Sequence, residues 1–108
     1  MIKVLHIGDI VGAPGRTLFA RVAHRMRAEE QVDVIIVNAE NSAAGRGLTP
    51  GLAEELFAAG ADVLTLGDHT WDQKEIMPYL DREPRVVRPA NFAPGCPGRG
   101  ITTVETPK

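Results

Sequence analysis

The chain has little cysteine, no surplus of positive charge and no long apolar run. Cys96 is the only cysteine in 108 residues, which excludes an intrachain disulfide and a CxxC pair and fits a reducing compartment. Twelve Lys and Arg against 14 Asp and Glu give a formal net charge of −2, which provides no field for holding duplex nucleic acid. Apolar runs such as 34–37 are far too short to span a bilayer, and residues 1–7 lack the pattern of a signal peptide. We therefore expect a cytoplasmic protein with no membrane partner.

The composition is that of a globular protein, with 44% hydrophobic and 24% charged residues. We interpret residues 1–108 as a single domain or a piece of one. Strand patterns alternate with helix patterns; the predicted strands are 2–7, 33–37 and 62–66, and the predicted helices are 16–30 and 50–59. This order with short connections predicts parallel strands joined by right-handed crossovers. The predicted fold class is α/β with a parallel βαβαβ core.

The last third of the chain is less regular. A short helix over 73–79 is weakened by Pro78, because a proline beyond the first turn removes a backbone hydrogen bond. Residues 85–88 form a short strand pattern, and residues 93–100 have the composition of a loop. Residues 101–105 are predicted to form a last strand, so that a β-rich layer starts at the C-terminal end.

Polar side chains follow each of the three main strands. Asp9 ends the first, Glu40 and Asn41 follow the second, and Asp68 and His69 follow the third. The carboxyl ends of parallel strands share one edge of a sheet, where open α/β sheets bind their ligands, so we expect these residues to converge. Two carboxylates about 4 Å apart repel by roughly 4 kcal/mol at an effective dielectric near 20, so cations or protons must neutralise them. These donors suit Mn, Fe or Zn ions, and a carboxylate can bridge two ions about 3.5–4 Å apart.

Two other interpretations of these residues stay open. Gly67-Asp68 is also typical of a turn in which the aspartate caps a following helix. Gly8, Gly12 and Gly15 form a glycine-rich turn, but their spacing matches neither the dinucleotide motif nor the P-loop. Asp9 would also repel a phosphate unless a metal ion lay between them. A Rossmann-type cofactor site is therefore disfavoured.

Five short motifs, in this order, resemble the YmdB-type branch of the calcineurin-like metallophosphoesterases. They are Gly8-Asp9 with 14–16, Asn38-Ala39-Glu40-Asn41, the run 67–72 (GDHTWD), the run 88–92 (RPANF) and the run 97–101 (PGRGI). The resemblance runs the length of the chain. It implies an α/β/β/α sandwich, a dinuclear metal centre, and phosphodiesterase activity on small substrates such as 2′,3′-cyclic nucleotides.

The resemblance also implies roles for single residues. Asp9, Glu40 and Asn41 correspond to metal ligands, with Glu40 as the bridge, and His69 corresponds to an acid beside the substrate. Asp68 falls on a ligand position where the family normally has asparagine. Family members run to more than twice this length and carry further histidine ligands, so we expect this chain to be the N-terminal portion of a longer domain.

The leading hypothesis is a phosphodiesterase that uses two Fe, Mn or Zn ions. A hydroxide bridging these ions would attack phosphorus in line, and His69 would aid the leaving oxygen. One alternative is a non-catalytic metal-binding or regulatory module of the same fold, and another is a flavodoxin-like domain that binds a small ligand. We also consider a homo-oligomer, because uncovered sheet faces and edges favour association with a second copy of the chain.

Overall fold

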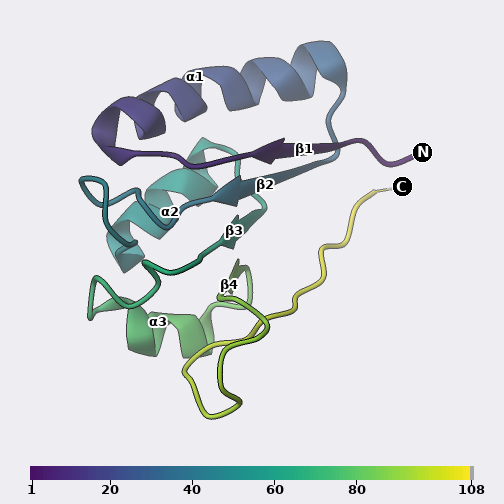
Figure 1. The fold of residues 1–108 in the computed structure, drawn as a ribbon. Helices are drawn as coiled ribbons and strands as arrows, with labels where there is room; N and C mark the ends of the chain where they lie inside the picture. The colour runs from purple at the N-terminus through teal and green to yellow at the C-terminus, as the bar shows by residue number, and fades with distance from the viewer. Residues whose placement is uncertain (108) are drawn as a thin grey trace.

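The computed structural model describes residues 1–107 as a parallel sheet alternating with helices (Figure 1). The elements are β1 (Val4–Ile7), α1 (Gly12–Glu30), β2 (Val34–Asn38), α2 (Pro50–Ala59), β3 (Val63–Thr65), α3 (Ile76–Arg82) and β4 (Val86–Val87). The strands lie in the order β1-β2-β3-β4, and every pair is parallel. The predicted α/β class is confirmed, and the short strand pattern at 85–88 supplies the fourth strand.

One buried cluster joins the sheet to all three helices. The register places Ile7 beside Val37, Val37 beside Leu64, and Leu64 beside Val86 across the four strands. The helices pack on this row through Phe19 and Ala23 of α1, Leu56 of α2, and Ile76 and Leu80 of α3. Alternate residues of a strand point to opposite faces, so the odd positions of β1 pack inward while Val4 and His6 are exposed.

Local chemistry fixes the ends of α2. The Thr49 hydroxyl oxygen accepts a hydrogen bond from the backbone N–H of Leu52 at 3.2 Å, and Pro50 is the first helical residue. Gly60 ends the helix with φ of 125°, and its N–H donates to the carbonyl groups of Leu56 and Phe57. The predicted helix 50–59 is confirmed at both ends.

The other two helices differ from their predicted bounds. Helix α1 begins at Gly12 rather than at 16, with φ of 57° at Gly12 and Pro14 within the first turn. Helix α3 spans Ile76–Arg82 rather than 73–79, which also brings Pro78 into a first turn. The predicted weakening by Pro78 was wrong, because the N–H groups of the first turn have no partner within the helix.

The predicted last strand is also wrong. Residues 101–105 have strand composition but form no strand, and Figure 1 shows this segment as an irregular trace leading to the C-terminus. A strand requires a neighbouring backbone with which to pair. Strand β4 has only two residues and pairs with β3, so it offers little edge for a further strand. The second sheet of an α/β/β/α sandwich is therefore not formed by residues 1–107.

Part of the apolar surface beyond β1 is uncovered. Phe19 and Ala23 of α1 are buried, whereas Leu18, which helical periodicity places on the same apolar face, is 61% exposed. A cavity of about 260 Å³ lies between Leu18 and the end of β1. The apolar face of α1 is thus wider than the sheet beneath it.

Within residues 1–107, no helix combines the length and the apolar character that crossing a membrane requires.

Candidate functional site

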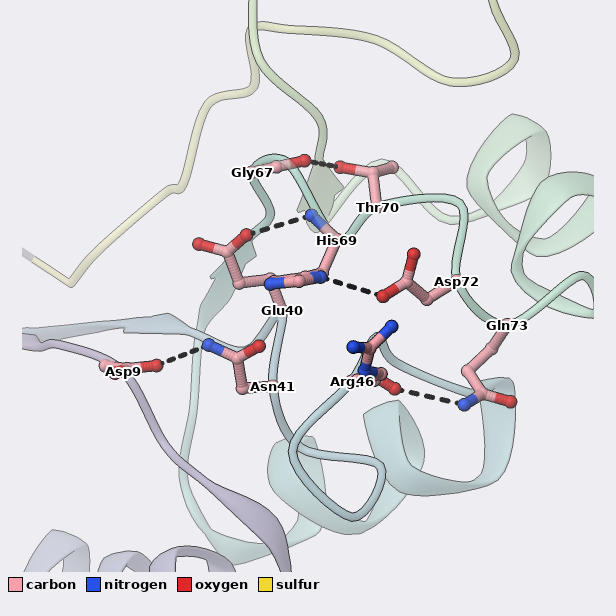
Figure 2. A network of polar contacts seen from close by, with 9 residues as sticks. All are labelled: Asp9, Glu40, Asn41, Arg46, Gly67, His69, Thr70, Asp72 and Gln73. Carbon is pink, nitrogen blue, oxygen red and sulfur yellow. Dashed lines mark hydrogen bonds and ion pairs between the residues drawn. The ribbon is translucent and has the colours of Figure 1, made fainter.

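Asp9 and Asn41 meet where β1 and β2 end. The backbone N–H of Ile10 donates to the carbonyl of Asn38 at 3.2 Å, and the N–H of Gly12 donates to the carbonyl of Asn41 at 3.0 Å. Between these two links, Asp9 adopts a left-handed conformation with φ of 42°, which aspartate tolerates better than most residues. The Asn41 side-chain N–H₂ donates to Oδ1 of Asp9 at 2.6 Å (Figure 2). The predicted convergence of these two strand ends is confirmed.

Glu40 connects the end of β2 to the end of β3. Its Oε1 accepts a hydrogen bond from the side chain of Asn38 at 3.3 Å, and its Oε2 accepts one from the backbone N–H of His69 at 3.2 Å. The carboxylate also lies directly against Gly67, where an added Cβ atom would come within 2.5 to 2.7 Å of its Oε2, Oε1 and Cδ atoms. Position 67 therefore admits only glycine while Glu40 keeps this place. The sequence indicated a turn at Gly67-Asp68, but it did not indicate that Gly67 makes room for the Glu40 carboxylate.

A tight turn presents His69 at this edge. The N–H of Thr70 donates to the carbonyl of Gly67 at 3.1 Å, and the fully buried Thr70 hydroxyl donates to the same carbonyl. The N–H of Asp72 donates to the carbonyl of His69 at 3.2 Å. In the side chains, His69 Nδ1 lies 2.8 Å from Oδ2 of Asp72 (Figure 2). Asp72 belongs to the sequence motif 67–72, but its place three residues after His69 did not by itself indicate that the two side chains are in contact.

Asp68 stands apart from the other candidates. Its side chain is exposed and forms no hydrogen bond or ion pair within residues 1–107. It does not cap a helix, because α3 begins well after it with Glu75 at the N-cap. The helix-cap interpretation of Asp68 was therefore wrong, and the structure leaves its carboxylate available on the same turn as His69.

The two C-terminal motifs, 88–92 and 97–101, contact each other, and the first of them also contacts the turn that carries His69. The buried guanidinium of Arg88 donates to the carbonyls of Pro89 at 3.0 Å and Pro97 at 3.4 Å, and the Arg88 backbone N–H donates to Arg99 at 3.0 Å. Phe92 packs on Trp71 with ring centroids 5.9 Å apart. These motifs support the position of the turn rather than add donors to the site.

The loop after Asn41 forms one wall. Its Ser42 carbonyl accepts a hydrogen bond from Arg16 at 2.5 Å, and its Arg46 carbonyl accepts one from the Gln73 side chain at 3.0 Å. At Gly47, with φ of 75°, an added Cβ would lie 2.9 Å from Gln73, so the loop packs closely against the segment after His69. Figure 2 shows Arg46 on the same side of the site as His69 and Asp72.

The donor types of this edge fit a metal ion, but the described residues supply only part of a ligand set. Because the N–H₂ of Asn41 is directed at Asp9, its carbonyl oxygen is left as the donor, beside the carboxylates of Asp9 and Glu40. Hard oxygen donors with one imidazole suit Mn, Fe or Zn. Within residues 1–107, however, no group of three or more His, Cys, Asp and Glu side chains lies close enough together to hold an ion by itself.

Relatives of the chain are similar over most of its length. A 2′,3′-cyclic-nucleotide 2′-phosphodiesterase from Bacillus subtilis (strain 168) is 44% identical over 104 residues, which cover 96% of this chain and 39% of that protein. A putative phosphatase/phosphodiesterase from Mycoplasma genitalium is 38% identical over 91 residues, which cover 84% of this chain and 32% of that protein. The chain thus spans well under half the length of these relatives.

Solved structures and a family model agree with these similarities. A hypothetical protein from Thermus thermophilus superposes with a TM-score of 0.86 at 39% identity, over 94% of this chain and 39% of that one. A novel phosphatase from Mycoplasma pneumoniae superposes with a TM-score of 0.85 at 36% identity, over 92% of this chain and 37% of that one. The family model described as YmdB-like protein matches residues 5–108. The chain therefore belongs to the YmdB-like protein family.

Proposed function

We propose that this chain is the N-terminal portion of a cytoplasmic, metal-dependent phosphodiesterase that acts on small phosphodiesters such as 2′,3′-cyclic nucleotides. The observation that carries the proposal is the meeting of three strand ends, in which Asn41 contacts Asp9 at 2.6 Å and Glu40 accepts a bond from His69 at 3.2 Å. The Bacillus relative, named for this activity, supports the substrate class. The free Cys96 fits a reducing compartment.

Two ions of Fe, Mn or Zn would be held here by Asp9, Glu40, Asn41 and Asp68. Glu40 follows β2, the strand that lies between β1 and β3, and this position would suit a ligand shared by both ions. When bound, such ions lower the pKa of a water molecule towards neutrality and neutralise phosphate charge. Two such ions would need about ten donor positions, of which this chain offers roughly half, and the rest would come from the remainder of the protein.

The chain's own residues would orient the substrate and supply a proton. His69 lies on the turn after β3, and its backbone N–H donates to Glu40. From this position its imidazole would donate a proton to the oxygen that leaves phosphorus. A proton given to that oxygen makes an alkoxide a better leaving group. The complete protein, in which these roles are tested, is this chain together with the remainder that its relatives carry.

The proposal is tested by reconstituting the metal-free complete protein with Mn²⁺, Fe²⁺ or Zn²⁺ and assaying 2′,3′-cyclic AMP. We expect metal-dependent cleavage of the bond to the 2′ oxygen, which leaves the 3′-phosphate. Metal binding without hydrolysis of any diester would favour the non-catalytic module instead. Flavin or nucleotide binding in the presence of a chelator would favour the flavodoxin-like alternative.

Residues 1–108 alone are expected to bind metal weakly, hydrolyse little diester and self-associate. The reason is that part of the ligand set is missing and that apolar surface is uncovered, with Val4 53% and Leu18 61% exposed. Assays with bis-p-nitrophenyl phosphate and sedimentation velocity measure these properties. Robust metal-dependent turnover by a monomer of these residues would contradict the expectation that a longer chain is required.

Asp68→Asn in the complete protein is expected to weaken metal affinity while lowering KM for a diester, with kcat unchanged or raised. Ionised Asp68 only accepts hydrogen bonds, whereas asparagine could bind a metal ion through its carbonyl and donate its N–H₂ to the phosphate. The substitution also removes a negative charge that repels an anionic substrate. Calorimetric metal titration and steady-state kinetics provide the comparison. Tighter metal binding together with a higher KM would place Asp68 outside the metal centre.

A further inference from the structure

We propose that Asp72 is a positioning residue for His69, and this inference rests on the proposed function. Oδ2 of Asp72 lies 2.8 Å from His69 Nδ1, and no other side-chain partner of Asp72 is found within residues 1–107. Figure 2 shows the imidazole ring between Asp72 and the strand-end residues Glu40 and Asn41. The second ring nitrogen, Nε2, is on the side of the ring away from Asp72.

The turn fixes the two side chains relative to each other. Asp72 lies three residues after His69, and its N–H donates to the carbonyl of His69 at 3.2 Å. The intervening Thr70 is fully buried and bonded to Gly67, while Trp71 packs against Phe92. The backbone therefore holds the carboxylate beside the ring without requiring the pair itself to shape the turn.

This contact determines which ring nitrogen exchanges a proton. An ionised carboxylate only accepts hydrogen bonds, so the hydrogen in the contact belongs to Nδ1 of His69. Nε2 then remains as the atom that binds and releases a proton. When the diester is cleaved, the Nε2–H bond breaks and an O–H bond forms on the departing oxygen, while Nδ1–H stays bonded to Asp72. The carboxylate also limits rotation of the ring, which keeps Nε2 turned towards the strand ends.

A purely structural role explains the contact less well. The His69 and Asp72 side chains are 36% and 30% exposed, and exposed pairs of this kind add little to folding stability. Glu40, the other carboxylate that is hydrogen-bonded to His69, accepts from the backbone N–H and leaves the ring to Asp72. Removal of Asp72 is therefore expected to change catalysis more than folding.

The Asp72→Asn variant of the complete protein tests whether Asp72 affects the rate of proton transfer from His69. Asparagine has the same shape, but its N–H₂ can donate to Nδ1 and so favour the wrong tautomer. We expect kcat for 2′,3′-cyclic AMP to fall by about 10–100-fold with KM changed by less than about threefold, because only proton transfer is affected. Bis-p-nitrophenyl phosphate, whose leaving group needs no proton, should lose far less. Asp72→Glu should restore part of the rate.

Glu75→Gln is the matched control, because Glu75 is an exposed carboxylate on the same segment with no side-chain partner within residues 1–107. It should retain the wild-type kcat. An equal loss on both substrates, or no loss in Asp72→Asn, would overturn the positioning role.

A second readout does not depend on turnover. In metal-free protein labelled with ¹⁵N-histidine, the ring nitrogen shifts of neutral His69 should show the Nδ1–H tautomer, and Asp72→Asn should change it to Nε2–H. The Nε2–H tautomer in an active wild-type enzyme would overturn this inference alone. A wild-type protein that hydrolyses no diester would instead overturn the proposed function and, with it, the catalytic meaning of the pair.

Discussion

The His69→Ala variant of the complete protein is expected to lose about 10²–10⁴-fold in kcat, the usual range for a general acid, with a smaller loss of metal. His69 follows Asp68 on the turn after β3, and its backbone N–H donates to Glu40 at 3.2 Å. The backbone of His69 is thus bonded to the candidate metal centre, while its imidazole remains available to the substrate.

Comparing substrates whose leaving groups differ in basicity tests whether His69 acts as a general acid. Hydrolysis of 2′,3′-cyclic AMP, which expels an alkoxide, should fall much further than hydrolysis of an activated p-nitrophenolate ester. His24→Ala serves as the control, since His24 is exposed on α1 away from the strand ends. Equal losses on the two substrates would argue against an acid, because only the alkoxide needs the proton.

Gly67→Ala is expected to lower kcat/KM by about 100-fold or more, since misplacement of a catalytic group by about 1 Å can cost this much. The new methyl group would fall within 2.5 to 2.7 Å of the Glu40 carboxylate. Glu40 is only partly buried, so its side chain can turn away and the fold can persist. The loss should therefore appear in metal affinity and turnover rather than in the unfolding temperature.

The control for this substitution is Gly51→Ala on α2, where an added Cβ would have no atom within 4 Å other than those of its chain neighbours and of its own helix backbone. This variant should keep its metal and its activity, and alanine suits a helix better than glycine. A Gly67→Ala protein that binds metal and turns over like wild type would show that Glu40 does not act from the place the structure gives it.

The sequence predicts the sheet well because each strand carries its own signal. Three apolar runs separated by helical patterns fix a parallel order, and that order alone brings the residues after β1, β2 and β3 to one edge. The contact of Asn41 with Asp9 is the direct result. Residues adjacent to strand ends could therefore be found without coordinates.

Other features depend on contacts between distant residues. The constraint on Gly67 arises from Glu40, a neighbour across the sheet, and the role of Asp72 requires the geometry of the turn. The segment 101–105 has the composition of a strand, but composition cannot show whether a backbone partner exists. The exposure of Leu18 likewise reflects how far the sheet extends beneath α1, which helical periodicity does not reveal.

The most direct test of the metal centre is calorimetric titration of Mn²⁺ into the metal-free complete protein and its Glu40→Gln variant. Glu40 is the carboxylate that joins the end of β2 to the turn after β3, and we propose it as the bridge. Two ions should bind per wild-type chain, and Glu40→Gln should lose at least one of them while Glu75→Gln loses none. Absence of Mn²⁺ binding in the wild type, or unchanged binding in Glu40→Gln, would contradict a metal centre at these strand ends.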